Sequence, residues 1–190
     1  QTTQRLENGM ANIDYAYDAD YNRVWKKQEV SEGVYLIQTN IYDSNNNLTE
    51  EKRWQTDQPT NFFITRYEYD AQNRRTKVKK VLGDGTELVE EWEYNTDGQV
   101  ERKIDPRGYT MTYEYDDFGN KAREYDPSNT AYQTQYQYDT VGNLTNRIDA
   151  LGRETHFEYD ALGRKTKEVN ALGYESTWVY AGPSLIEEET

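Results

Sequence analysis

Acidic and amide side chains cluster near the start of the sequence, where their oxygens could hold a metal ion. The two clusters are Asp14, Asp18 and Asp20, and Asp43, Asn45 and Asn47. Calcium prefers such oxygen ligands. Neither cluster has the Gly and the terminal Glu of an EF-hand loop, and the Gly-Gly-x-Gly-x-Asp repeat of calcium β-rolls is missing from the sequence. The sequence therefore favours turn-forming roles, and we predict no cofactor and no metal.

A catalytic centre is not indicated either. His156 is the only histidine, and without partners of fixed geometry it supplies neither a typical zinc site nor a Ser-His-Asp triad. Adjacent carboxylates occur at Glu50-Glu51, Glu90-Glu91 and Asp116-Asp117, but neighbours on a strand point to opposite faces and cannot form a glycosidase pair. The absence of Cys excludes thiolate nucleophiles and disulfides. We predict a non-enzymatic protein, with His156 in a structural or surface role.

The composition narrows the class of protein further. The chain has 190 residues, 35 Asp plus Glu against 22 Lys plus Arg, and a net charge of -13. Phosphates would repel it, so nucleic acid is excluded as a partner. No run of apolar residues approaches the roughly 20 needed to cross a membrane, which excludes membrane insertion. The start at Gln1 carries no signal peptide, so we expect a piece of a longer chain. The 18 Tyr and 4 Trp favour strands.

A Tyr-Asp pair recurs along the whole sequence and sets the positions of all these residues. It stands at Tyr17, Tyr42, Tyr69, Tyr94 (with Asn), Tyr115, Tyr138 and Tyr159, and in a terminal form at Tyr180. The steps are 25, 27, 25, 21, 23, 21 and 21 residues. Seven of the eight positions two residues earlier are aromatic, with Asn40 as the exception. Because residues two apart on a strand share a face, each repeat predicts an aromatic pair on one side of a sheet.

These pairs predict a structural aromatic ladder, in which each hairpin packs its rings against the hairpins before and after it. We expect the rings to stack on one another across the sheet, which contributes roughly 0.2–1 kcal/mol per pair. His156 lies beside Phe157 and therefore on the opposite face. The ladder consists of Tyr67, Tyr69, Trp92, Tyr94, Tyr113, Tyr115, Tyr136, Tyr138, Phe157, Tyr159, Trp178 and Tyr180.

Gly or Asn recurs four residues after the Tyr, and again in a second turn within each repeat. These residue types enter the left-handed region at least cost. With the Asp three residues earlier, they predict type I turns closed by a bulge. Further second turns are expected at Glu32-Gly33, at 57–60 and at 126–129. The structural turn residues are Asn73, Gly98, Gly108, Gly119, Gly142, Gly152, Gly163 and Gly173.

The fold predicted from this pattern is all-β: one repeat array of antiparallel hairpins, with about fourteen to sixteen strands in one continuous, curved sheet. We expect a single array over residues 1–190. Its repeats are irregular over 1–91 and regular over 92–181, and an acidic tail follows at 182–190.

The string Tyr-x-Tyr-Asp-x-x-Gly-Arg/Asn resembles the YD repeat of the Rhs family, most clearly over 157–164 and 113–120. This family includes bacterial Rhs toxins, the B and C shell components of Tc toxins, and teneurins. The resemblance implies a β-sheet that spirals into a hollow shell, which in the toxins encloses a toxic domain. Asp105-Pro106-Arg107-Gly108-Tyr109 is similar to the motif at which Rhs shells cleave themselves. Tyr109 replaces its Leu and three repeats follow, so we interpret it as an ordinary turn.

By this resemblance, the segment is a structural wall or spacer of an extracellular or cell-surface protein, serving toxin encapsulation or surface display. Its partners would be further repeats of its parent chain, copies of itself, glycans or an enclosed toxin domain. Two alternatives stay open. Exposed Trp92 and Trp178 could stack on sugars in a carbohydrate-binding adhesin, and the two sheet edges could pair copies into a homopolymeric filament.

Overall fold

The computed structural model describes residues 13–182 and the backbone of residues 184–189, and all of its regular structure is strand. The described chain divides into two units. One lies within Gln1–Glu93 and Ile104–Gly108, and the other within Tyr94–Lys103 and Tyr109–Thr190. The described part contains no helix that could cross a membrane.

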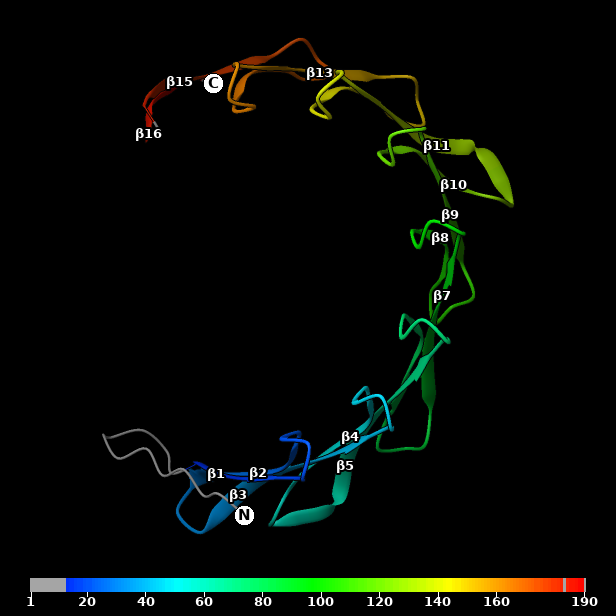
Figure 1. Cartoon of the computed structure of the whole chain (residues 1–190), viewed down its shortest axis with the longest axis vertical. Coiled ribbons are helices and arrows are strands. Elements are labelled where there is room, and N and C mark those ends of the chain that lie inside the picture. The colour runs from blue at the N-terminus through cyan, green and yellow to red at the C-terminus, as the bar shows by residue number, and fades with distance from the viewer. Residues whose placement is uncertain (1–12, 183, 190) are drawn as a thin grey trace. The chain divides into compact units, whose positions relative to one another are not determined.

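The first unit holds strands β1 to β6 and all but the last residue of β7, and within it each strand pairs antiparallel with its neighbour along the sequence (Figure 1). Their bounds are β1 Ile13–Tyr17, β2 Arg23–Ser31, β3 Val34–Tyr42, β4 Leu48–Gln55, β5 Gln58–Tyr69, β6 Arg75–Val81 and β7 Glu87–Tyr94.

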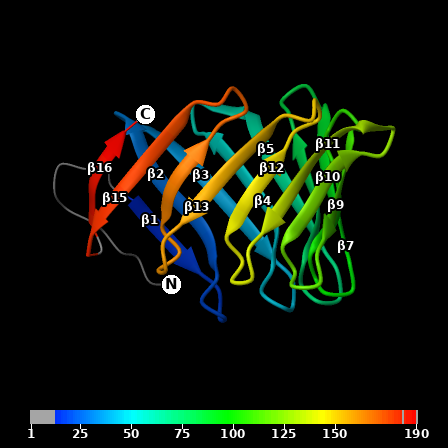
Figure 2. The same cartoon turned by 90° about the horizontal axis from the view of Figure 1, so that it is seen from above.

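The second unit holds strands β8 to β16, which follow the same order; Figure 2 shows β9 to β13 side by side with turns at both ends. Their bounds are β8 Val100–Ile104, β9 Thr110–Tyr115, β10 Lys121–Asp126, β11 Asn129–Tyr138, β12 Leu144–Ile148, β13 Glu154–Tyr159, β14 Lys165–Val169, β15 Glu175–Ala181 and β16 Ser184–Glu189. The predicted all-β array of antiparallel hairpins is therefore confirmed within each unit.

The antiparallel order places the turns of each unit in two rows, one along each edge of its sheet. First-row turns follow odd-numbered strands and carry the Tyr-Asp pair; second-row turns follow even-numbered strands. The first-row turns after β1, β3, β5, β9, β11 and β13 end in a bulge. Tyr69 pairs with Arg75 and Glu68 pairs with Lys77, which leaves Thr76 without a partner in the ladder of strand pairs. The bulge adds one residue to the even-numbered strand and increases its local twist.

Two second turns and the C-terminal segment differ from the expectation. The chain reverses at Thr56-Asp57 and at Pro127-Ser128, so Gln58–Thr60 and Asn129 belong to strands. Two-residue connections suffice there because the strands stay paired up to the turn. Ser184–Glu189, expected within an acidic tail, forms β16 on β15. The free backbone groups of β15 would otherwise form an unpaired edge.

The sheet of each unit has a thin core. Among the described side chains, only Ile37 and Val78 are buried apolar residues. Four polar side chains are also buried: Gln38, Asn40, Asn146 and Thr155. The twelve ladder aromatics are all half-buried, while the residues between the members of each pair (Glu68, Glu93, Glu114, Gln137, Glu158 and Val179) are exposed. Stability must therefore come from contacts repeated along each sheet.

Candidate functional site

The first-row turn is the repeated element from which the candidate site is built. In the turn that begins at Asp160, the Gly163 amide donates to the Asp160 carbonyl (2.9 Å), and the Asp160 amide donates to the Arg164 carbonyl (3.0 Å). Oδ1 of Asp160 accepts from the amides of Leu162 and Arg164, and Oδ2 accepts from the Arg164 guanidinium (2.7 Å). One carboxylate thus holds three groups of its own turn.

The residue four positions after the Tyr adopts the left-handed conformation in the seven first-row turns that follow Tyr17 to Tyr159, and a Gly does so in five second-row turns. The eight predicted turn residues have positive φ: Asn73 (60°), Gly98 (84°), Gly108 (83°), Gly119 (86°), Gly142 (92°), Gly152 (74°), Gly163 (74°) and Gly173 (84°). Tyr21 (63°) and Asn46 (64°) occupy the same position in the two earliest turns. A Cβ at Gly163 would also lie 3.3 Å from Oδ1 of Asn143, so this position needs both the conformation and the space.

Successive first-row turns touch one another through the side chain that follows the left-handed residue. Nδ2 of Asn47 donates to Oδ1 of Asn73 (2.8 Å), which lies one repeat further along. Nε2 of Gln99 donates to the Gly119 carbonyl (2.8 Å), and Arg164 donates to the Gly182 carbonyl. These contacts hold neighbouring hairpins at a fixed separation along the edge of the sheet.

The Tyr of the Tyr-Asp pair ties its hairpin to the preceding one. Its hydroxyl donates to the carbonyl at the start of the neighbouring even-numbered strand. This bond joins Tyr42 to Arg23 (3.1 Å), Tyr69 to Leu48 (2.9 Å), Tyr115 to Val100 (2.7 Å), Tyr138 to Lys121 (3.0 Å) and Tyr180 to Lys165 (2.8 Å). Burial raises the pKa of the Tyr115 and Tyr138 hydroxyls, so both stay protonated and able to donate.

Between rings of alternate strands lies a cation. Arg75 on β6 lies 6.0 Å from the Tyr67 ring centroid and 5.2 Å from that of Trp92. Lys121 and Lys165 take the same place in later repeats. Lys121 contacts Tyr113 (5.6 Å) and Tyr136 (4.7 Å), and Lys165 contacts Phe157 (5.9 Å) and Trp178 (4.0 Å). Each cation therefore joins the aromatic residues of two hairpins.

The expectation of ring-on-ring stacking needs correction at these three places. The paired rings lie on alternate strands, about 10 Å apart at the usual strand spacing, which exceeds the roughly 7 Å reach of an aromatic pair. The even-numbered strand fills the gap with a long cationic side chain. The sequence contains a signal for this column, since position six after each Tyr alternates between cation and aliphatic residue: Arg23, Leu48, Arg75, Val100, Lys121, Leu144 and Lys165.

A carboxylate completes the cation contact in β10 and β14. Nζ of Lys121 lies 2.7 Å from Oε2 of Glu124, whose Oε1 accepts from the Tyr136 hydroxyl (2.8 Å). Burial raises the pKa of Glu124, but hydrogen bonds from Lys121 and Tyr136 outweigh it and leave this pKa below its ordinary value. Burial, and then the bond to Glu124, raise the pKa of Tyr136. Lys165 and Glu168 repeat the ion pair at 2.7 Å.

Asn40, which interrupts the aromatic column, makes an equivalent tie with polar atoms. Its Nδ2 donates to the Arg23 carbonyl (2.7 Å), the carbonyl that also accepts from Tyr42. Nε2 of Gln38 donates to Oδ1 of Asn40 (3.0 Å), so the amide of this buried side chain is used at both ends. The irregular early repeats therefore keep the connection between hairpins without the ring.

A second small cluster, which the sequence pattern did not indicate, lies on the other face of the first unit. Trp54 pairs across strands with Ile37 and with Phe62, and Nζ of Lys52 lies 4.4 Å from the Phe62 ring centroid. Its members sit one position out of phase with the ladder. A search for the Tyr-x-Tyr pattern alone therefore misses them, although the alternation from Lys52 to Trp54 carries the signal.

The acidic residues considered for calcium serve their own turns. Asp18 accepts from the backbone amides of Asp20 (3.0 Å) and Asn22 (2.8 Å). Asp43 accepts from the amides of Asn45 and Asn47, both at 2.9 Å. Within the described part of the chain, no three His, Cys, Asp or Glu side chains are grouped as they would be around a metal ion.

His156 and the carboxylate pairs also have local partners. Nε2 of His156 lies 3.3 Å from Oε2 of Glu154, and about half of each side chain is exposed. Glu50 pairs with Arg66 (2.9 Å), whereas Glu51 pairs with Arg53 (2.8 Å). Glu50 and Glu51 thus form separate surface ion pairs, one across strands and one along a strand, and His156 contacts Glu154 at the surface. Asp116 and Asp117 line an open depression of the second unit.

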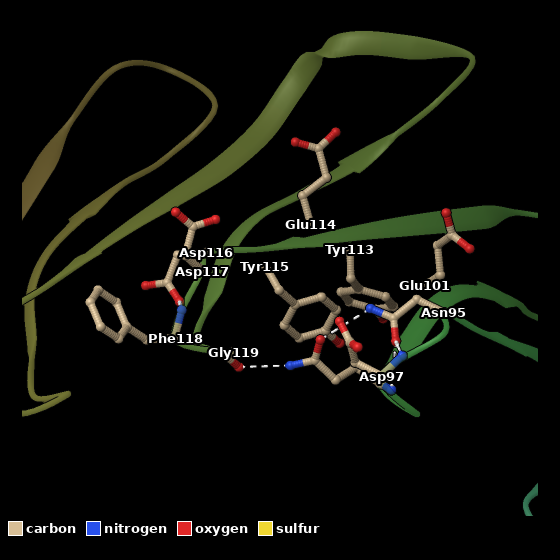
Figure 3. A pocket seen from close by; sticks show the side chains of 11 residues that line it. Asn95, Asp97, Glu101, Tyr113, Glu114, Tyr115, Asp116, Asp117, Phe118 and Gly119 are labelled. Atoms are coloured by element: carbon tan, nitrogen blue, oxygen red, sulfur yellow. Dashed lines mark hydrogen bonds between the residues drawn. The ribbon is translucent and has the colours of Figure 1, made fainter.

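An open depression of about 840 Å³ lies between two successive first-row turns of the second unit (Figure 3). Its lining includes Tyr113 and Tyr115, with Asp97 and Glu101 from the neighbouring hairpin. The bond from Gln99 to Gly119 crosses it. The depression is thus the space between two repeats, bridged by the same turn-to-turn contact that occurs elsewhere.

Comparisons with known proteins agree with this geometry. The sequence profile described as RHS Repeat matches residues 42–86, 94–131 and 138–175, which together exceed half of the chain. No curated protein matches the sequence significantly.

Solved structures show the same fold. A TcdB2-TccC3-Cdc42 structure matches with a TM-score of 0.75 and 15% identity, over 94% of this chain and 11% of its own. TcdB2-TccC3 without its hypervariable C-terminal region matches with a TM-score of 0.75 and 14% identity, over 94% of this chain and 11% of its own. A Tc holotoxin pore of Photorhabdus luminescens, with a TccC3 mutation, matches with a TM-score of 0.67 and 15% identity, over 88% of this chain and 10% of its own. The chain spans about a tenth of the length of these structures' chains.

Proposed function

Since the chain belongs to the RHS repeat family, we propose that it is a non-enzymatic structural segment, a β-sheet wall or spacer within a larger extracellular or cell-surface protein. The wall would either shelter a toxin domain or display another part of its parent chain. Its partners would be further repeats and, where it shelters, the enclosed domain. The likeness to Tc toxin structures supports the fold of such a wall.

The observation that carries the proposal is the use of the repeated residues. The Tyr hydroxyl binds the preceding hairpin, the Asp carboxylate holds its turn, and the cation lies between rings of two hairpins. The residues that recur are therefore those that fix strand spacing and register. A sheet held in this way is stiff along its length, which suits a wall or a spacer.

Carbohydrate binding receives less support from the same contacts. Nζ of Lys165 lies 4.0 Å from the centroid of the Trp178 ring, and the Arg75 guanidinium lies 5.2 Å from that of Trp92. A sugar stacking on those faces would have to displace a cation. Loss of binding on a glycan array in Trp92→Ala or Trp178→Ala, with folding retained, would favour the adhesin instead.

Limited proteolysis of the full-length parent protein tests the wall. We expect the region that contains these repeats to resist protease, and the polypeptide that the parent shelters to be cut much more slowly than the same polypeptide expressed alone. Equal cleavage rates would reject shelter and leave the spacer. Rapid cutting within residues 92–181 of the native parent would overturn both, because a wall cannot open locally so readily.

A further inference from the structure

Large apolar side chains stand at the tips of five turns in the second unit, between residues 116 and 173, whereas Asp97 takes the equivalent position in the earlier turn at 95–98. They occupy the position just before the left-handed Gly, and each is largely exposed. In the first row they are Phe118 (88% exposed), Val141 (81%) and Leu162 (75%); in the second row they are Leu151 (73%) and Leu172 (76%). Exposed apolar residues that gather in rows indicate an interaction surface.

The turn itself does not need an apolar residue at this position. Leu162 contributes only its backbone amide, which donates to Oδ1 of Asp160 (2.9 Å). In the first unit the same position is polar, and the turns have the same hydrogen bonds and the same left-handed residue. Those polar residues are Asp20, Asn45, Gln72 and Asp84. Folding therefore does not explain the apolar tips of the second unit.

The two rows fit each other in spacing. Turns of one row follow every second strand, so their tips repeat at about 10 Å. Three first-row tips (Phe118, Val141 and Leu162) enclose two gaps, and the second row offers two tips (Leu151 and Leu172) at the same repeat. The tips of one row can therefore enter the gaps of the other.

Charge favours a contact between the two rows over a contact of the first row with itself. The three first-row turns carry four aspartates and one arginine: Asp116, Asp117, Asp139, Asp160 and Arg164. The two second-row turns are balanced, because Arg153 pairs with Asp149 (2.6 Å) and Asn170 takes the place of the next Asp. Two first rows brought together would place like charges side by side.

We propose that the first-row tips Phe118, Val141 and Leu162 dock between the second-row tips Leu151 and Leu172 of a second copy of these repeats. The contact is heterologous, because different patches of the two copies meet. The proposal deepens the wall function and rests on it, since it names what a wall segment joins along its edge.

Complementation between two variants tests this contact. One variant carries Phe118→Asn, Val141→Asn and Leu162→Asn, and the other carries Leu151→Asn and Leu172→Asn. Asn45 occupies the same position naturally, so these substitutions suit the turn. Gln72→Asn, in the first unit, is the matched control. Circular dichroism verifies folding, and analytical ultracentrifugation of the 190-residue chain over a range of concentrations reports the mass.

The parent chain and the control should associate as concentration rises, each variant alone should stay monomeric, and their equimolar mixture should reach twice the monomer mass and no more. A monomeric parent at millimolar concentration, or a mixture that stays monomeric, would overturn the proposal. Association of the Leu151→Asn, Leu172→Asn variant alone would also overturn it, because the first row would then pair with itself. The protease test examines the wall, and ultracentrifugation examines the contact between copies. Failure of one proposal can therefore be distinguished from failure of the other.

Discussion

The hydroxyl of Tyr115, at the end of β9, donates a hydrogen bond of 2.7 Å to the carbonyl oxygen of Val100, at the start of β8. This bond passes from one first-row hairpin to the hairpin before it, where the main-chain pairing is about to end. The same bond recurs in four other repeats of the described chain. In these repeats the Tyr forms the bond between hairpins, and where an Asp follows it, that Asp forms the bonds within the turn.

Tyr115→Phe should loosen the connection between these hairpins without emptying the ladder. The ring remains, while the Val100 carbonyl loses its partner, at a cost of about 0.5–1.5 kcal/mol. Repeat arrays open locally, so hydrogen exchange of the amides in β8 to β10 is the appropriate measurement. Tyr174→Phe, whose ring is 71% exposed, is the control and should leave exchange unchanged. Equal protection in both variants would show that the hydroxyl is dispensable.

Gly163→Val and Gly119→Val should each destabilise their hairpin by about 1–3 kcal/mol, because a β-branched residue is strained at φ of 74° or 86°. Gly163→Asn should cost less, since Asn73 adopts the same conformation naturally. Gly83→Ala is the control, because Gly83 lacks positive φ and a Cβ there would meet Asn61 at an ordinary 3.4 Å. Thermal unfolding ranks the stabilities of the parent and these variants. Equal melting of the Val variants and the parent would contradict the turn geometry.

Much of this architecture follows from the spacing of a few residue types. The alternation around Tyr113 and Tyr115 indicates a strand with one aromatic face, and Gly119 four residues later locates the turn, because few residues accept positive φ. The recurrence of a cation six residues after alternate tyrosines is visible in the sequence, but its contact with the rings is not. Lys121 precedes Glu124 by three residues and would be attributed to a solvated face, and only the register of β9 to β11 brings it beside Tyr113 and Tyr136.

The turn carboxylates should make stability dependent on acid pH. A side-chain hydrogen bond from Asn143, and then backbone bonds, hold the pKa of Asp139 below its ordinary value of 3.8. Because the folded pKa lies below the unfolded one, the unfolded chain binds more protons in acid. The contribution is therefore complete above about pH 5 and is lost as pH falls through the folded pKa.

Asp139→Asn separates this effect from turn formation. Asn95 forms the same turn naturally, so the variant should unfold like the parent near pH 7. At about pH 3 the parent should have lost stability that the variant retains in part, since the amide does not titrate. Urea unfolding at the two pH values measures the difference. A parallel decline of both proteins would assign the acid sensitivity to other carboxylates.

Lys165 should couple energetically to Trp178, 4.0 Å from its ring centroid. Lys165→Met keeps an apolar stem and removes the charge, and Trp178→Leu removes the ring. A double-mutant cycle on these two changes should give a coupling of about 0.5–2 kcal/mol in local opening measured by hydrogen exchange. Glu168→Gln, which leaves the cation but weakens its 2.7 Å ion pair, should reduce the stability of β14 without abolishing the coupling. Zero coupling in the presence of normal folding would mean that Lys165 only covers the ring, and that the hairpins are joined by their hydrogen bonds alone.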